Sequence, residues 1–239
     1  MDFSPLFISV SDESPCGPDL YDDDAWFTKM NLLEAKVFGE KKTGYEDGKS
    51  IEVWTPPKWP EVKSSAYELC HQSRTLRLGV ILTECAFELE GITGFRDGLR
   101  MITSWLGNWW DHLHPMPPEE AGDLRRPVLN TLDHERFVIR LRKIPIARSH
   151  GQSYSIQDIV QNEGSGGDAN LALLARQAIA GMDSIQRTAM VGAAREAAAD
   201  VQKISDIIRE KCGPRYAMNM GELTEALRDF EKYLTLEEV

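Results

Sequence analysis

The residues best suited to chemistry stand together at positions 109–115, which read Trp-Trp-Asp-His-Leu-His-Pro. Indoles, an acid and imidazoles so close together could build a metal site, a binding groove or a packed helix end. The spacing disfavours a metal site: His112 and His114 are two residues apart, so on a continuous helix they point about 200° away from each other. Zinc catalysis also needs three protein ligands and an open position. We therefore expect a helix end at which Asp111 and His114 hydrogen-bond loose backbone groups, and we predict no metal-binding residue.

No other pattern in the chain is typical of an active site. The four cysteines are scattered without a CxxC pair, and there is no GxSxG nucleophile motif. The glycine-rich residues 164–167 lack the GxxxxGKS/T pattern of a phosphate-binding loop, so a flexible hinge describes them better. We predict no catalytic residue, no cofactor and no enzymatic activity. A metal-dependent hydrolase that uses Asp111, His112, His114 and a distant ligand stays open as an alternative.

The composition describes an acidic protein with enough apolar residues for a sizeable core. The 239 residues are 42% hydrophobic and carry a formal net charge of −11. Such a charge disfavours binding to a nucleic-acid backbone, which needs a basic face. The N-terminus lacks the basic and apolar segments of a secretory signal, and no apolar run is long enough to span a bilayer. We expect a cytoplasmic protein that binds no nucleic acid and inserts into no membrane.

Apolar residues recur at helical spacing through most of the chain, which predicts a mostly α fold. The three acids at 22–24 suit the start of a first helix. Trp59 and Pro60 suit the start of a second helix, because proline is favoured in a first turn. Gly91 should end a strong apolar stripe and separate it from the next one.

Two later segments predict helix with particular local features. Residues 123–143 should be helical, although the piece after Glu135 could instead form a short strand. Near the end of the chain, Asn219 and Glu222 have the spacing of a capping box, which predicts a helix start there.

The sequence divides into two helical parts. We expect a multi-helix N-terminal domain over 1–161, a linker over 162–168, and a smaller alanine-rich helical hairpin or bundle over 169–239. Within the first part, residues 39–58 are rich in glycine, proline and charge and should form a long exposed loop.

Exposed aromatic residues are the best candidates for contact with a partner. Tyr45 and Trp54 lie within the expected loop over 39–58, and we predict that they form a partner-binding surface. Trp110 follows Trp109 by about 100° around its helix. A second layer must cover Trp110 or the residue lines an interface. Core packing is the default, and Trp110 is kept beside Tyr45 and Trp54 as a candidate partner-binding residue.

Several short motifs occur in a fixed order over residues 10–160. The order starts with the lead-in Ser-Pro-Cys-Gly-Pro-Asp-Leu at 14–20 and continues with Trp59-Pro60, Arg74-Thr75-Leu76-Arg77-Leu78, Glu90-Gly91-Ile92-Thr93-Gly94-Phe95, Gly98-Leu99, Trp110-Asp111, His114-Pro115, Arg126, Asn130, Leu132, Tyr154-Ser155 and Asp158. In these residues, and in their order over 10–160, the chain resembles the ImpA-related N-terminal domain of TssA-type proteins of the bacterial type VI secretion system. Thr75 departs from the acid that is usual in the family.

The resemblance implies a non-enzymatic assembly or scaffold protein. Such a protein would bind baseplate and tail tube and sheath proteins, promote or guide tail polymerisation, and form a homo-oligomer. The motif residues expected to be mainly structural are Trp59, Arg77, Gly91, Gly94, Asp111 and His114. Because the chain ends at Val239, we expect the ring-building C-terminal region of complete family members to be missing from it. A helical adaptor unrelated to secretion stays open as an alternative.

Overall fold

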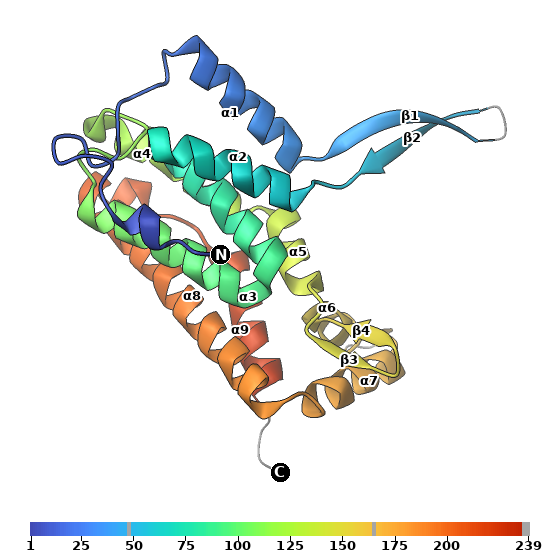
Figure 1. Cartoon of the computed structure of the whole chain (residues 1–239). Helices are drawn as coiled ribbons and strands as arrows, with labels where there is room; N and C mark the ends of the chain where they lie inside the picture. Colours follow the sequence, from blue (N-terminus) through green and yellow to red (C-terminus); the bar gives the residue numbers. More distant parts are fainter. Residues whose placement is uncertain (47–48, 164–165, 236–239) are drawn as a thin grey trace.

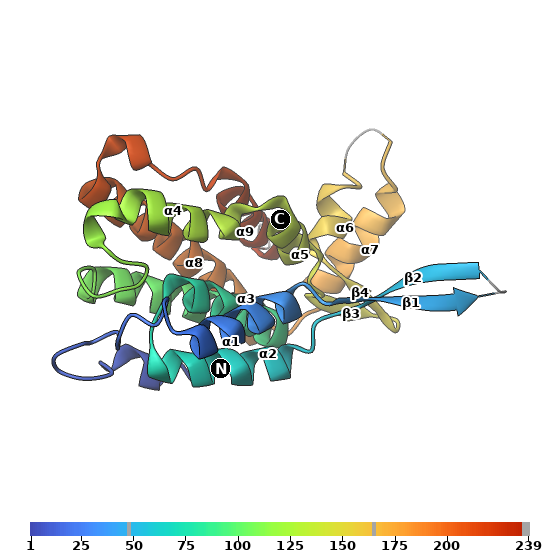
Figure 2. The ribbon, with the colours of Figure 1, turned by 90° about the horizontal axis from the view of Figure 1, so that it is seen from above.

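The molecule is a succession of packed helices with α3 at its centre. The computed structural model describes residues 1–46, 49–163 and 166–235. The helices are α1 (Asp24–Val37), α2 (Trp59–Gln72), α3 (Leu76–Asn108), α4 (Ala121–Asn130), α5 (Glu135–Lys143), α6 (Ile156–Val160), α7 (Ala169–Ala180), α8 (Ser184–Cys212) and α9 (Gly221–Leu234). Helix α1 packs on α2, α2 on α3, α3 on α8 and α8 on α9, an order that can be followed in Figure 1 and Figure 2. The predicted mostly α fold is confirmed.

The first two helices begin where the sequence predicts. The carboxylate of Asp23 accepts the backbone N–H of Trp26 at 2.8 Å, which satisfies a free donor in the first turn of α1. Pro60 lies in the first turn of α2, where its missing N–H costs nothing. Trp26, Met30, Leu33 and Val37 form the buried side of α1. Their spacing of three or four residues is what allows α1 to cover α2.

Helix α3 is kinked at Gly91, where the backbone has φ 68° and ψ −148°. Thr75 caps its start, since its hydroxyl accepts the N–H of Leu78 at 3.2 Å. Apolar residues occur on most sides of the helix, and Phe87, Phe95 and Trp105 are each at most 1% exposed. A helix that is apolar all round is buried on several faces. This explains why α3 contacts α2 on one side and α8 on another.

Of two local predictions, the helix over 123–143 is confirmed after Glu135 and the capping box of the last helix is wrong. The segment after Glu135 is helix α5 and not the alternative strand, because Phe137, Val138 and Leu141 form one buried helical face. Asn219 and Glu222 do not form a capping box. Helix α9 begins at Gly221 without a side-chain cap from its own segment. Instead, the carboxylate of Asp133 accepts the N–H of Leu223 at 2.6 Å. The cap of α9 therefore comes from a residue 90 positions earlier in the chain.

The prediction of a long loop over 39–58 is also wrong, because most of that segment forms a β-hairpin. Strands β1 (Glu40–Glu46) and β2 (Lys49–Thr55) pair antiparallel, with Glu40 opposite Thr55 and Glu46 opposite Lys49. We call this hairpin the arm, because it projects away from the helices (Figure 1). Most of its side chains are exposed on both faces, so its strands lack the apolar alternation by which a half-buried strand is recognised.

A second, shorter hairpin joins α5 to α6. Its strands are β3 (Ala147–Ser149) and β4 (Gln152–Tyr154), and it packs with α6 and α7 at one end of the molecule. Ser155 and Asp158 form a capping box at the start of α6, in which the Ser155 N–H donates to the Asp158 carboxylate at 2.7 Å.

The helices after the proposed linker share a hydrophobic core with those before it. Buried residues of α8 and α9 belong to the same cluster as those of α1 to α5, and α8 lies along α3. The predicted linker over 162–168 is described only in part, since 164 and 165 lie outside the described residues. The division into 1–161 and 169–239 stays a prediction.

Candidate interaction site

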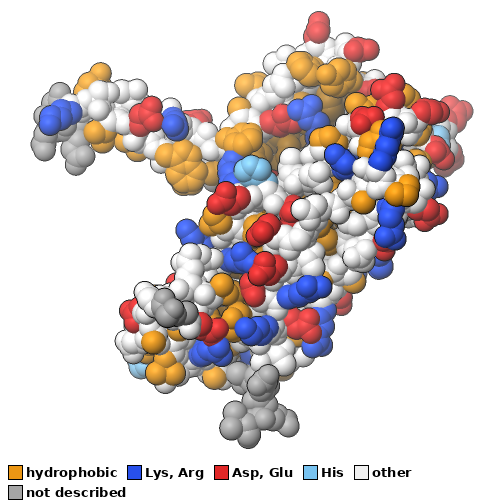
Figure 3. All heavy atoms as spheres, turned by 180° about the vertical axis from the view of Figure 1, so that it is seen from behind, with side chains coloured by type: hydrophobic (Ala, Val, Ile, Leu, Met, Phe, Trp, Pro, Cys, Tyr) orange, Lys and Arg blue, Asp and Glu red, His pale blue; other side chains and the backbone are white. Residues whose placement is uncertain are grey.

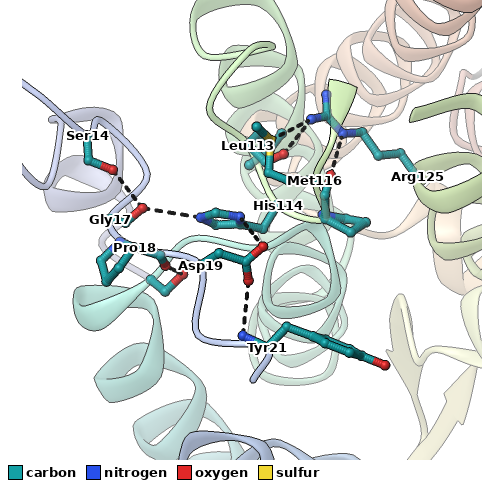
Figure 4. A network of polar contacts seen from close by, with 11 residues as sticks. Ser14, Gly17, Pro18, Asp19, Tyr21, Leu113, His114, Met116 and Arg125 are labelled. Atoms are coloured by element: carbon teal, nitrogen blue, oxygen red, sulfur yellow. Dashed lines mark hydrogen bonds and ion pairs between the residues drawn. The ribbon is translucent and has the colours of Figure 1, made fainter. Parts of the chain in front are cut away.

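The helix end at Trp110 is organised by a buried arginine that sequence reasoning missed. Arg125 on α4 has no exposed surface, and its guanidinium donates to the carbonyl oxygens of Trp110, Leu113 and Pro115. Figure 4 shows Arg125 beside Leu113 and Met116. The guanidinium also lies over the indole of Trp110, 4.6 Å from the ring centre. Burial lowers the pKa of the Arg125 guanidinium from its ordinary value, but arginine stays charged at any physiological pH.

We expected Asp111 and His114 to hydrogen-bond the free backbone groups near this helix end. In the structure, Arg125 donates to three of the carbonyls there. Backbone carbonyls at a helix end need donors, and a guanidinium carries five N–H groups in a fixed plane. A short aspartate cannot donate at all, and Asp111 is exposed. The available signal was the spacing of Ala121, Arg125 and Leu129, which share one buried face of α4.

His114 ties this helix end to the N-terminal lead-in. Its Nε2 lies 3.2 Å from the carbonyl oxygen of Gly17, and its Nδ1 lies 3.6 Å from the carboxylate of Asp19 (Figure 4). His114 is buried, whereas His112 is exposed, so the chain directs the two imidazoles to different environments. Within residues 1–46, 49–163 and 166–235, no group of three or more His, Cys, Asp or Glu side chains is placed to hold a metal ion.

The cysteines are in poor surroundings for nucleophilic chemistry. Cys16 and Cys85 are buried, and burial raises the pKa of each thiol to about 12. Burial likewise raises the pKa of the Cys70 thiol. The thiolate is the reactive form of cysteine, so these thiols are inert near neutral pH.

The remaining motif residues lie at joints between helices. Arg77 of α3 forms an ion pair of 2.6 Å with Glu34 of α1. Trp59, at the start of α2, lies under the guanidinium of Arg140 from α5, 5.2 Å from the ring centre. These contacts connect α1, α2, α3 and α5.

Two motif glycines allow the kink in α3. Gly91 has the positive φ of 68° that side chains rarely adopt. At Gly94 an added Cβ would lie 2.2 Å from the carbonyl oxygen of Ala86, so no side chain fits there.

The arm presents two different faces. Cross-strand partners point to the same side of a hairpin and successive residues alternate, so the register assigns each side chain to a face. The aromatic face holds Lys41, Thr43, Tyr45, Ser50, Glu52 and Trp54. The opposite face holds Glu40, Lys42, Gly44, Ile51, Val53 and Thr55. Figure 3 shows hydrophobic, basic and acidic side chains interspersed along the projecting arm.

Tyr45 and Trp54 occupy different parts of the aromatic face. Tyr45 lies near the tip and is 79% exposed, while Trp54 lies near the root and is 55% exposed. Between them, Lys41 and Glu52 form an exposed ion pair of 3.1 Å. An aromatic ring held out on a strand offers a large contact area at low entropic cost. The arrangement is suited to binding another protein surface.

The root of the arm is fixed to the helices by hydrogen bonds to the end of α1. The indole N–H of Trp54 donates to the carbonyl oxygen of Phe38 at 3.2 Å. Arg136 of α5 donates to the carbonyl oxygen of Val37 at 3.1 Å and lies over the Phe38 ring. Free carbonyls at a helix C-terminus favour such donors. Trp54 therefore also positions the arm.

Trp110 differs from the two arm residues. Only 7% of its surface is exposed, beneath Arg125. Core packing, the default interpretation of Trp110, describes this position, and we leave Trp110 out of the proposed contact surface.

The fold of this chain is similar to that of a solved structure. The chain superimposes on a solved structure with a TM-score of 0.72 and 18% identity, over 98% of this chain and 92% of the other. That structure is the N-terminal domain, including the conserved ImpA_N region, of the TssA component of the type VI secretion system from Burkholderia cenocepacia. At this identity the likeness establishes the fold alone.

The sequence establishes the family. The family described as "ImpA, N-terminal, type VI secretion system" matches residues 8–134, more than half of the 239 residues. The chain therefore belongs to this family of type VI secretion-system components. It is also 28% identical to the type VI secretion system component TssA1 of Pseudomonas aeruginosa, over 95% of this chain and 67% of the relative. The resemblance predicted from the motifs is confirmed.

Among the residues that the structure describes, no helix combines the length and the apolar character that a membrane span requires.

Proposed function

We propose that this chain is a non-enzymatic assembly component that binds baseplate and tail tube and sheath proteins of the type VI secretion system, and so promotes or guides tail polymerisation. Membership of the ImpA N-terminal family supports the link to the secretion system. The observation that carries the binding role is the arm, on which Tyr45 and Trp54 are held in solvent by a fixed root.

The arm is suited to modest binding that is repeated many times. A two-residue aromatic contact with an exposed ion pair buries little area, and small interfaces of this kind bind weakly by themselves. A homo-oligomer would present many arms at once and raise the effective concentration of the second and later contacts. We therefore propose that oligomerisation accompanies this function.

The geometry gives no support to a metal-dependent hydrolase. The imidazole of His114 contacts Gly17 and Asp19 in a buried joint, while Asp111 and His112 are exposed. The three residues thus do not face a common space.

A pull-down tests the proposal. The chain is immobilised and offered separately purified tube, sheath and baseplate proteins of the same secretion system, and the molar mass of the chain is measured by light scattering on the same sample. Retention of at least one of these components, with a mass above that of a 26.9 kDa monomer, is the expected result. If no component is retained by the intact chain, the binding role is wrong.

A further inference from the structure

A trough runs between α1 and α2 and continues to the root of the arm. Between the two helices, a hollow of about 210 Å³ is lined by Leu32, Lys36 and Leu69 among others. At the root of the arm, a second hollow of about 170 Å³ is lined by Lys36, Lys42 and Lys58 among others. Lys36 borders both, so we treat them as one surface. Figure 1 shows α1 and α2 side by side, with the arm beginning beyond the end of α1.

The trough is separate from the aromatic face of the arm. Of the arm residues that line it, Glu40, Lys42 and Thr55 all belong to the opposite face. A partner bound in the trough would thus not need Tyr45, and the trough does not depend on the function proposed for the aromatic face.

The part of the trough between the helices has an apolar floor. Leu33 of α1 and Leu69 of α2 are buried beneath it, with 1% and 3% exposure. Leu32 is 60% exposed at its rim, where a bound apolar side chain would cover it. Covering an exposed leucine next to an apolar floor releases water from both and favours binding.

The residues that line the trough include four lysines and three glutamates, so its local charge is slightly positive although the chain carries a net charge of −11. Lys29 and Lys36 are exposed, and neither forms an ion pair with another residue in the described part of the chain. Lys42 and Lys58 are paired with glutamates of the chain, at 2.9 and 3.2 Å. Lys29 and Lys36 therefore attract carboxylates to the apolar surface beside them. They do so at one place on a molecule that is otherwise acidic.

A nucleic acid fits this surface less well than a protein segment does. Glu40, Glu61 and Glu68 stand among the lysines, so the trough offers a few separate cationic positions and not the continuous basic surface that a phosphate backbone needs. An apolar floor also offers nothing to a phosphate backbone, whereas it suits leucine-like side chains.

We infer that the trough binds an acidic, amphipathic segment of a partner protein. Its carboxylates lie against Lys29 and Lys36, and its apolar side chains cover Leu32 above the floor formed by Leu33 and Leu69. This is the helix-groove mode of recognition, with charge fixing the orientation of the segment.

Peptide selection tests the inference without a known partner. A phage-displayed library of random peptides is selected on the immobilised whole chain, and enriched peptides are resynthesised and titrated. We expect enriched peptides that combine acidic with leucine-like residues. We expect K29E/K36E to weaken their binding about tenfold or more, and L32S to weaken it by a smaller factor.

The matched control is K211E. Lys211 is an exposed lysine in the last turn of α8, as Lys36 is in the last turn of α1, so K211E alters net charge and helix dipole as the K36E half of the double variant does. K211E should leave peptide binding unchanged. Enrichment of neutral or basic peptides, or acidic peptides that bind K29E/K36E as tightly as the native chain, would overturn the inference. So would tighter retention of a fluorescent DNA duplex by the native chain than by K29E/K36E.

Discussion

The indole nitrogen of Trp54 on β2 lies 3.2 Å from the carbonyl oxygen of Phe38, the residue that follows the last turn of α1. This hydrogen bond joins the arm to the helix that precedes it. A two-stranded hairpin is marginally stable by itself, so its root determines how firmly its outer residues are held. Trp54 therefore has two roles, as an anchor of the arm and as part of its aromatic face, whereas Tyr45 has only the second.

Replacing Trp54 by Phe should loosen the arm, because the ring is kept and the N–H donor is lost. A hydrogen bond of this kind contributes roughly 1 kcal/mol, so amide exchange in the arm should accelerate about fivefold. Hydrogen exchange followed by mass spectrometry measures this. Y45A is the control, because Tyr45 is far from the root and should leave exchange unaltered. Equal exchange in W54F and the native chain would show that the root is held by other contacts.

Replacing Arg125 by Met should destabilise the fold strongly. The change keeps much of the side-chain volume but leaves the carbonyls of Trp110, Leu113 and Pro115 without their donor. We expect a loss of about 3 kcal/mol or more in the free energy of unfolding, measured by urea denaturation.

The adjacent Arg126 provides the control for Arg125. Its guanidinium makes a long, exposed contact of 3.5 Å with the carbonyl oxygen of Arg215 and lies 5.9 Å from the ring centre of Tyr216, so R126M should cost less than about 1 kcal/mol. Similar losses for the two variants would mean that the buried guanidinium does not organise the helix end.

Alanine substitutions at Gly91 and Gly94 should lower the stability of the fold, whereas the same substitution at Gly192 should raise it. G91A should cost about 1–2 kcal/mol, because alanine disfavours the positive φ at this kink. G94A should also destabilise, since its Cβ would collide with the carbonyl oxygen of Ala86. Gly192 in α8 has no atom within 4 Å of an added Cβ, so G192A should stabilise by about 0.5–1 kcal/mol. Thermal unfolding of the three variants gives the signs, and a destabilised G192A would contradict this explanation.

Glu84 should make stability fall as pH rises. Burial raises the pKa of its carboxyl above the usual range, and the nearby guanidinium of Arg140 only partly opposes this. The folded state then holds a proton that the unfolded state has lost, so the free energy of unfolding decreases with pH between the unfolded and the folded pKa. The stability of the native chain relative to E84Q should therefore be greater at the acidic end of this window than above it. An NMR titration that places the Glu84 pKa below its usual range would refute this.

The sequence predicts those parts of the fold that depend on local pattern. The acids at 22–24, the Trp59-Pro60 pair and Gly91 each mark a helix start or a break, and the structure places them there. These signals are local. They arise from free backbone N–H groups in the first turn of a helix and from the backbone conformations that proline and glycine allow, so they can be recognised without knowing which distant residues lie nearby.

Features that depend on distant residues or on exposed strands were missed. Asp133 caps α9 across 90 positions, and Arg125 meets carbonyls of a different helix end; neither partner can be chosen from spacing alone. The arm was missed because its strands are solvated on both faces. Its sequence does carry a hairpin signal, since Asp47-Gly48 separates two runs with β-formers such as Tyr45 and Val53. Residues 47 and 48 lie outside the described part of the chain.

The proposed function requires that the chain binds tube, sheath or baseplate protein through the arm. The direct measurement is the retention of tube, sheath or baseplate protein by the double variant Y45A/W54A, with circular dichroism on the same samples and Y21A as an exposed aromatic control outside the arm. We predict retention lowered about tenfold or more with an unchanged helical spectrum, and native retention by Y21A. Undiminished retention by Y45A/W54A would contradict the account.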